Sequence, residues 1–461
     1  MAKRSNFMLH RIHHPETRHL MTEGSLWKGI LLLSLPLMLS QVLQVLFNMA
    51  DVAVVGRFSS SEALGSVGST TTLVTLFTGL LIGMGSGVNV RVAQFLGAKQ
   101  EKDVRETVHT SLLLCTLLGI VLTALCLLCA RGMLELLKTK KVLLDGAVLY
   151  FRIYALGMPA LGIFNFGNAV LSANGDTKRP LLYLTLSGIL NVILNLVFVI
   201  VCHLDVAGVA LASIISQYLS AVLVLWRLFR DPGPCRLEWK AIAMTRDKIG
   251  SVLELGLPAG LQNAIFATAN LFIQSGVNSF DAVMVEGNAA AANADALVFN
   301  VMSAFYTACS SYMGQNLGAG QRDRVLKSYF ISLLYSFATG LILGLVLVFW
   351  GQGFLALFTD DAAVAAAGMH RLKIMGFSFG ISAFMDCSIA ASRGIGKSLV
   401  PTIIVILGSC VFRVIWVYTV FAYFHTIPSL YLLYVFSWTI TAVAEIAYFW
   451  KSYKKLNLAA V

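Results

Sequence analysis

Apolar residues run through this chain in long stretches that short polar segments separate. Each stretch is about 20 residues long, the length that an α-helix needs to cross the hydrocarbon core of a bilayer. The strands of a membrane barrel would be shorter and would alternate in polarity. We therefore predict an all-α integral membrane protein with twelve transmembrane helices. The predicted spans lie near residues 30–55, 64–88, 108–130, 147–171, 181–202, 207–229, 251–275, 285–312, 328–350, 372–392, 400–424 and 429–450.

Composition supports this class. Of the 461 residues, 57% are hydrophobic and 12% are charged, about half the charged share of a typical soluble protein. Cys126 and Cys129 form a C-x-x-C pattern, but it lies in a leucine-rich span and has no second pair elsewhere. We expect no metal, cofactor or disulfide framework.

The basic residues are distributed unevenly between alternate loops. The net charge is +11, and if the N-terminus lies inside, 25 of the 34 Lys and Arg residues fall on the cytoplasmic side against 7 outside. Positive charge gathers on the cytoplasmic side of membrane proteins. This asymmetry predicts a multi-pass protein of the cell membrane with both termini in the cytoplasm. It argues against nucleic acid as the partner of the basic residues.

The second half of the sequence repeats the first. "LSLPLMLSQ" at 33–41 matches "LGLPAGLQN" at 255–263, and "QFLGAKQEKDV" at 94–104 matches "QNLGAGQRDRV" at 315–325 with six of eleven positions identical. Six spans return the chain to its starting side, so the halves share one orientation. We predict two six-helix lobes related by a pseudo-two-fold axis along the membrane normal, a layout of secondary transporters. The expected divisions are an N-terminal arm (1–28), an N-lobe (29–230), a linker (231–249), a C-lobe (250–451) and a tail (452–461).

The first span carries a polar stripe at helical spacing. Gln41, Gln44, Asn48 and Asp51 are spaced 3, 4 and 3 residues apart, which places them on one helix face. Pro36 cannot donate to the carbonyl of the residue four positions before it, so it loosens the start of this helix. A carboxylate inside a membrane span is a functional hypothesis by default, because burying its charge is costly.

Two later spans carry polar residues at a depth similar to that of Asp51. Asn191 and Asn195 lie one turn apart in the fifth span, and Ser213 lies in the sixth. Asp51, Asn195 and Ser213 are each within roughly 10 Å of the outer ends of their helices. We expect these residues, together with Asn48 of the polar stripe, to converge on a pocket that holds a proton or Na⁺. The alternative is that the amides and hydroxyls only join helices together. The duplicate half has Ile273 where Asp51 stands, so the charge occurs in one lobe only.

Three further ionisable residues lie deep in predicted spans. Asp295 and Arg413 have similar depths, which favours an ion pair between them. Asp386 lies nearer the cytoplasm, so it either pairs with Arg413 or lines the substrate path. No histidine lies in mid-span and no Gly-rich phosphate loop of the P-loop type occurs. We expect no enzyme activity and no direct use of ATP.

Several motifs resemble the multidrug and toxic compound extrusion (MATE) transporters over residues 25–450. They are "LPLMLSQVLQVLFNMADVAVVGRF", "GVNVRVAQFLGAKQ" with its repeat "YMGQNLGAGQ", "SANGDTKRP" and "VAGVALASIISQ". The resemblance implies an antiporter that exports amphipathic, often cationic compounds in exchange for H⁺ or Na⁺. It implies two lobes in a V shape. We expect small molecules and the lipid bilayer as partners, and a monomer.

Carried over by position, Asp51 matches the coupling carboxylate of the prokaryotic branch, Asn191 its asparagine partner and Pro36 the proline at which the first helix bends. Ser213 stands where that branch usually has threonine. The family commonly reads Asn-x-x-x-Asp-Pro in the fifth helix, whereas this chain has Asn195 followed by Leu196. Another branch has a glutamate in the seventh helix, near Ala267 here. Asp51 is therefore the main charged candidate for binding the coupling ion.

The alternative function is a flippase for a lipid-linked precursor, from the same superfamily. A flippase of this kind would line its cleft with several basic residues, whereas only Arg413 lies deep in this chain.

Overall fold

The computed structural model describes residues 21–456, and these residues fold into a bundle of long helices. The first half contains α1 (Leu26–Phe58), α2 (Ser61–Gly97), α3 (Glu101–Leu136), α4 (Lys141–Ala155), α5 (Met158–Ala173), α6 (Lys178–Leu196), the π-turn η1 (Val197–Val201) and α7 (Asp205–Phe229). A short 3₁₀ turn, η2 (Trp239–Ala241), lies in the linker. The second half contains α8 (Arg246–Val277), α9 (Ala282–Gly318), α10 (Arg322–Leu355), α11 (Ala362–Gly394), α12 (Leu399–Val405), η3 (Ile406–Val411), α13 (Phe412–Trp416), η4 (Val417–Phe421), α14 (Ala422–Phe424) and α15 (Ile427–Lys454).

These elements form twelve membrane-crossing segments in two six-helix lobes. Between residues 21 and 456, nine helices are long and apolar enough to span a membrane, and the bent pair α4–α5 makes a tenth. The other two segments, α8 and α9, are 32 and 37 residues long but carry more polar residues. Segments α6–η1 and α12–α14 each form one span; the first ends in the π-helical segment η1, and the second contains the π-helical segments η3 and η4.

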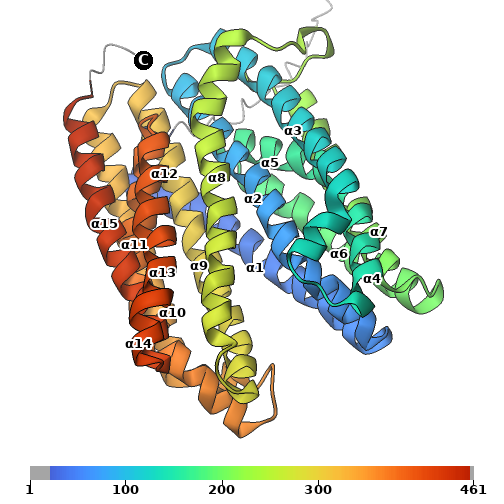
Figure 1. The fold of residues 1–461 in the computed structure, drawn as a ribbon. Helices are drawn as coiled ribbons and strands as arrows, with labels where there is room; N and C mark the ends of the chain where they lie inside the picture. Colours follow the sequence, from blue (N-terminus) through green and yellow to red (C-terminus); the bar gives the residue numbers. More distant parts are fainter. Residues whose placement is uncertain (1–20, 457–461) are drawn as a thin grey trace, which may run out of the picture.

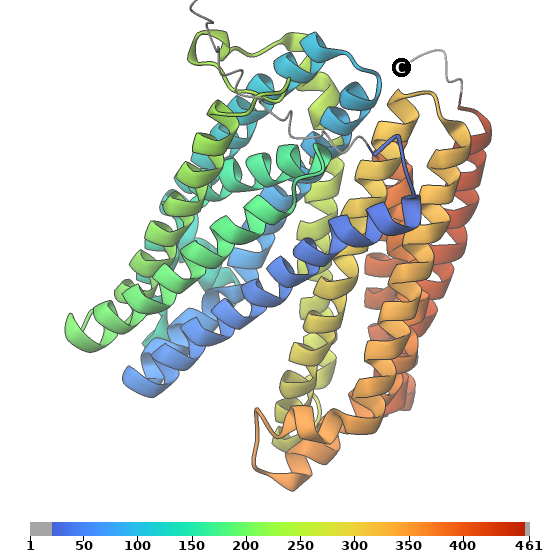
Figure 2. The same ribbon diagram turned by 180° about the vertical axis from the view of Figure 1, so that it is seen from behind.

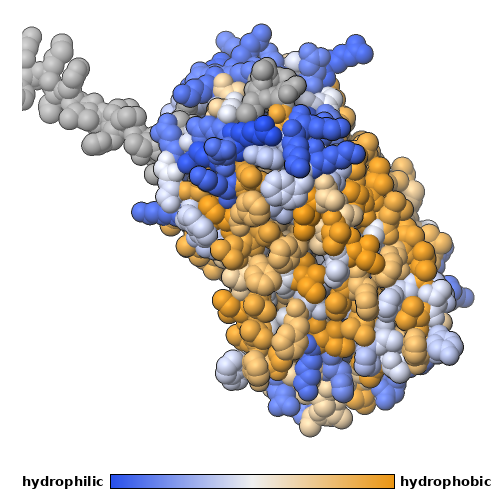
Figure 3. Space-filling view, turned by 90° about the vertical axis from the view of Figure 1, so that its left-hand side faces the viewer, coloured by the Kyte–Doolittle hydropathy of each residue, from blue (hydrophilic) through white to orange (hydrophobic). Residues whose placement is uncertain are grey.

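The two lobes are close together at one end and diverge toward the other (Figures 1 and 2). We call the first the junction end, where α2 and α9 terminate at Gly97 and Gly318, and the second the splayed end, where α1 terminates at Phe58. The linker between the lobes and the last described residues lie at the junction end (Figure 1). An apolar belt separates the polar surfaces of the two ends on the face seen in Figure 3. This pattern matches a bundle that crosses a bilayer.

The α2 helix is longer than its predicted span and passes through the Gly-rich stretch at 83–87. A side chain at Gly83 or Gly87 would overlap the backbone of α8 at Gly260 or Gly256. These glycines therefore let helices of different lobes pack backbone to backbone. The predicted span ends at residue 88, whereas α2 continues to Gly97 because these glycines pack without breaking the helix.

The predicted fourth span is broken into two helices. A bend of 46° separates α4 from α5 at Leu156 and Gly157. The first span, in contrast, runs as one continuous helix through Pro36. Near this proline, the carbonyl of Leu33 accepts a 3.0 Å hydrogen bond from the hydroxyl of Thr177, just before α6.

At the junction end, two repeated glutamines make reciprocal contacts between the lobes. Gln94 of α2 donates to the carbonyl of Gly394 (3.1 Å), and Gln315 of α9 donates to the carbonyl of Ala173 (2.7 Å). A side chain at Gly97 would overlap the carbonyl oxygen of Gln315, and one at Gly318 would overlap that of Gln94. We call Gln94, Gly97, Gln315 and Gly318 the junction latch. Both halves of the "Q-x-L-G-A" repeat thus take part in the same two-fold contact.

Candidate functional site

Asp51 lies beside the two asparagines of α6 near the splayed end. The amide nitrogen of Asn195 donates to Asp51 Oδ1 at 2.5 Å and to Asn191 Oδ1 at 3.3 Å. Asn195 is fully buried and Asn191 is nearly so, whereas Asp51 is partly exposed. The structure therefore brings together three of the residues selected from the sequence.

This arrangement leaves the side-chain oxygen of Asn195 without a hydrogen-bond donor among the described residues. Asn195 uses its amide nitrogen for both contacts, and its own Oδ1 is buried with no hydrogen-bond partner within residues 21–456. A buried polar atom without a partner is costly. The unpaired oxygen and the adjacent carboxylate form an oxygen-rich site that suits a proton on Asp51 or a hard cation such as Na⁺.

Ser213 and Asn48 do not join this hydrogen-bond network. Ser213 is buried in α7, while Asn48 is exposed on α1. In the part of the chain that the structure describes, no hydrogen bond links either residue to Asp51. Their predicted role in coupling stays a prediction.

Two tyrosines that the sequence analysis did not select lie close to this site. Tyr150 and Tyr154 of α4 stack on each other with 5.9 Å between ring centroids, and both are near enough to interact electrostatically with Asp51. Tyr150 also packs with Val54 and Val55 of α1. The spacing of four residues places both rings on one face of α4, a signal that was available in the sequence.

The corresponding position in the second lobe is apolar. Ile273 of α8 is 3% exposed and belongs to the hydrophobic core of the C-lobe. The two lobes share a fold but only one carries the Asp51 site.

Asp295 pairs with Arg371 and not with Arg413. Arg371 Nε donates to Asp295 Oδ2 at 2.7 Å, and its Nη1 donates to Asn288 Oδ1 at 2.6 Å. Tyr431 donates to the same amide oxygen at 2.9 Å. The predicted Asp295–Arg413 pair is wrong because α11 begins at Ala362, ten residues before the predicted span. Arg371 therefore lies roughly 14 Å along the helix axis from the start of α11, and its side chain reaches Asp295.

We expect Arg371→Met to lower the free energy of unfolding by about 3–5 kcal/mol, because it leaves a buried carboxylate without its partner. Thermal unfolding of the purified protein measures this loss. The double variant Arg371→Met/Asp295→Asn should recover part of the stability, since it removes both charges. Equal losses in the single and double variants would contradict the assignment of this pair.

Arg413 and Asp386 lie elsewhere in the C-lobe. Arg413 donates to Ser437 at 3.0 Å and lies 4.7 Å from the centroid of the Tyr434 ring. Asp386 makes no ion pair within 4.0 Å in residues 21–456, and its Oδ2 is buried without a partner. Neither the predicted pairing of Arg413 with Asp295 nor a direct pair with Asp386 is formed.

The polar stripe of α1 divides between two environments. Gln41 donates to Ser303 of α9 at 3.2 Å and so contacts the other lobe, whereas Asp51 faces α6 in its own lobe. Gln44 is exposed between them. The same helix thus carries the Asp51 site and a contact between the lobes.

Two repeated six-helix lobes that diverge from a junction, with a carboxylate inside one lobe, define a multi-pass membrane transporter fold. The MatE family matches residues 36–197 and again residues 258–419, so the match recurs at the spacing of the internal repeat. The chain belongs to the MATE transporter family.

Individual relatives agree with this assignment. The chain is 27% identical to "Probable multidrug resistance protein YpnP" of Bacillus subtilis over 78% of this chain and 80% of that protein. It is 26% identical to "FAD transporter" of Shewanella oneidensis over 75% and 77%. A solved MATE family transporter in an outward-facing conformation superposes with a TM-score of 0.89 at 21% identity, covering 97% of this chain and 99% of that chain. This likeness supports the fold.

Proposed function

We propose that this protein is a secondary active multidrug exporter that exchanges amphipathic, cationic compounds for H⁺ or Na⁺. The observation that carries the ion coupling is the buried Asp51–Asn195–Asn191 network with its unpaired acceptor oxygen. Relatives named as multidrug resistance proteins support drugs as substrates. A lipid-precursor flippase would need a cluster of free basic residues, and the buried arginines of the C-lobe do not support one: Arg371 pairs with Asp295, Arg413 donates to Ser437 and Arg393 donates to Gln262.

In the proposed cycle, the junction end faces the cytoplasm and the splayed end faces outward. The basic arm, linker and tail support this orientation. H⁺ or Na⁺ binds at Asp51 from outside and changes how α1 packs against α6, with Pro36 as the place where α1 bends. Substrate then leaves, and release of the ion into the cytoplasm restores the other state. Coupling requires the ion to bind the two states with different affinities.

Proteoliposomes test this proposal directly. When a cationic dye is added to vesicles that hold a proton gradient, the protein should exchange the dye for protons and so release them. If sodium is the coupling ion, vesicles that hold a Na⁺ gradient should release Na⁺ instead. Lipid translocation without dye-dependent ion movement would contradict the exporter and support the flippase.

We expect Asn195→Asp to increase the dependence of export on Na⁺. The change adds a second carboxylate to the site, and anionic oxygens favour a hard cation. Export at a series of Na⁺ concentrations and constant pH measures the effect, and Asn195→Ala serves as the matched control without the charge. Identical Na⁺ dependence in both variants would argue that Asn195 does not face the ion.

A further inference from the structure

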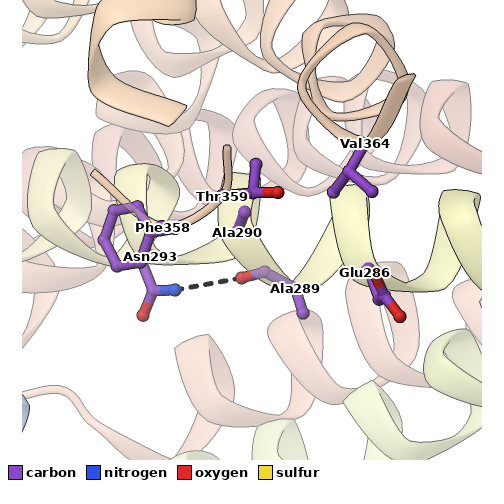
Figure 4. A pocket seen from close by; sticks show the side chains of 7 residues that line it. All are labelled: Glu286, Ala289, Ala290, Asn293, Phe358, Thr359 and Val364. Atoms are coloured by element: carbon purple, nitrogen blue, oxygen red, sulfur yellow. Dashed lines mark hydrogen bonds between the residues drawn. The ribbon is translucent and has the colours of Figure 1, made fainter. Parts of the chain in front are cut away.

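A second candidate site lies at the splayed end of the C-lobe. A pocket of about 330 Å³ opens between α9 and the segment that joins α10 to α11 (Figure 4). This volume falls at the lower end of the range for small-molecule sites. Its lining consists of Glu286, Ala289, Ala290, Asn293, Phe358, Thr359 and Val364.

The pocket contains a carboxylate that the fold does not use. Glu286 is exposed and has no ion-pair partner within residues 21–456. Asp281 and Asp361, in contrast, accept hydrogen bonds from the backbone at the starts of α9 and α11. The helix caps therefore account for those two acidic residues at this end, but not for Glu286.

The other lining residues complement a positive charge. Phe358 is partly buried and packs against Phe354 with 5.3 Å between ring centroids, which holds its ring in the pocket wall. Asn293 donates its amide nitrogen to the carbonyl of Ala289 at 3.0 Å, so its oxygen is available as an acceptor (Figure 4). Organic cations bind favourably to aromatic rings and to carboxylates.

One edge of the pocket, at Ala289 and Asn293, lies on the side of α9 that faces the other lobe. Ser303 on this helix bonds to Gln41 of α1, and residues advance by about 100° around a helix. Ala289 and Asn293 therefore lie within roughly 80° of Ser303 around the helix axis, nearer the splayed end. Both are exposed, because α1 and α9 diverge toward that end (Figure 2).

We propose that this pocket is a binding site for organic cations, in which Glu286 supplies the charge, Phe358 the aromatic face and Asn293 an acceptor oxygen. The inference rests on the proposed export function and adds a place where a substrate binds apart from the ion site. Asp51 lies in the other lobe, so a cation at Glu286 and an ion at Asp51 do not compete for the same carboxylate.

Equilibrium binding of tetraphenylphosphonium to the purified full chain tests this site, with neutral triphenylphosphine oxide as the uncharged probe of similar shape. We expect Glu286→Gln to raise the Kd of the cation about fivefold, the size of a partly exposed charge contact. The Kd of the neutral probe should stay unchanged. The difference should shrink at about 1 M salt, because salt screens exposed charges. Asp360→Asn, which removes a nearby exposed carboxylate outside the pocket, should change neither value.

Three results would overturn the site: no change in cation binding by Glu286→Gln, equal weakening of both probes, or an equal effect of Asp360→Asn. The same assay on Asp51→Asn separates this site from the proposed function. That variant should retain Glu286-dependent binding even though exchange is lost. If wild-type protein binds tetraphenylphosphonium with Glu286 dependence but shows no ion exchange, the coupling proposal fails and the pocket stands. If wild-type protein does not bind this cation, the pocket proposal fails, and the ion-exchange assay decides the export proposal separately.

Discussion

Asp51→Asn should reduce ion-coupled export to background, a loss of more than about tenfold, while the protein still folds and inserts. The amide keeps the size of the side chain and can still hydrogen-bond to Asn195, which holds Asp51 at 2.5 Å. It has no negative charge to hold Na⁺ and no proton to take up and release. Because the C-lobe has Ile273 at the equivalent position, the duplicate half cannot take over. Dye efflux from a pump-deficient host and ion flux in proteoliposomes measure the loss.

Glu62→Gln is the matched control for this experiment. Glu62 is an exposed carboxylate in the first turn of α2 at the same end of the molecule. Glu62→Gln removes one negative charge, as Asp51→Asn does, but leaves the hydrogen bonds of the Asp51 network unchanged. Wild-type efflux by Asp51→Asn, or an equal loss in Glu62→Gln, would show that the network does not carry the coupling.

Gly97→Ala should disrupt the junction latch and thereby block export. A Cβ at this position would overlap the carbonyl oxygen of Gln315 in the opposite lobe. Relief of the overlap requires α2 and α9 to separate, because the obstacle is backbone and not a flexible side chain. Overpacking of this kind costs about 1–3 kcal/mol, which shifts the balance between a joined and a separated junction by roughly 5-fold to 150-fold.

Hydrogen exchange measures the separation at the residues concerned. Peptides that cover 21–26 and 315–321 should exchange faster in Gly97→Ala, since Met21 and Gln315 are joined by a hydrogen bond in the closed junction. Gly250→Ala is the control, because a side chain there meets no atom within 4 Å. Gly318→Ala should reproduce the Gly97 effect by the two-fold relation of the latch. Unchanged exchange in both latch variants would show that the junction tolerates the extra atom.

Much of the fold could be predicted because apolar length and repetition are properties of the sequence. Twelve spans, two lobes and the importance of "Q-x-L-G-A" are visible in the printed residues. Errors occurred where a helix extends beyond its apolar core. The predicted span 372–392 leaves Arg371 outside the membrane, although α11 begins at Ala362 and buries Arg371 against Asp295. The bend between α4 and α5 was also missed, because both helices are apolar across the break.

The membrane class, the duplication and the restriction of the Asp51 carboxylate to one lobe follow from the printed residues, because each depends only on residue type and position along the chain. Which polar groups meet depends instead on how the helices pack. In the structure, Asn195 donates a hydrogen bond to Asp51, and Asp295 pairs with Arg371. Gln41 bonds to Ser303 of the other lobe and so lies apart from the ion site. These pairings depend on the rotation and depth of each helix against its neighbours. Residue spacing along one helix leaves both quantities open.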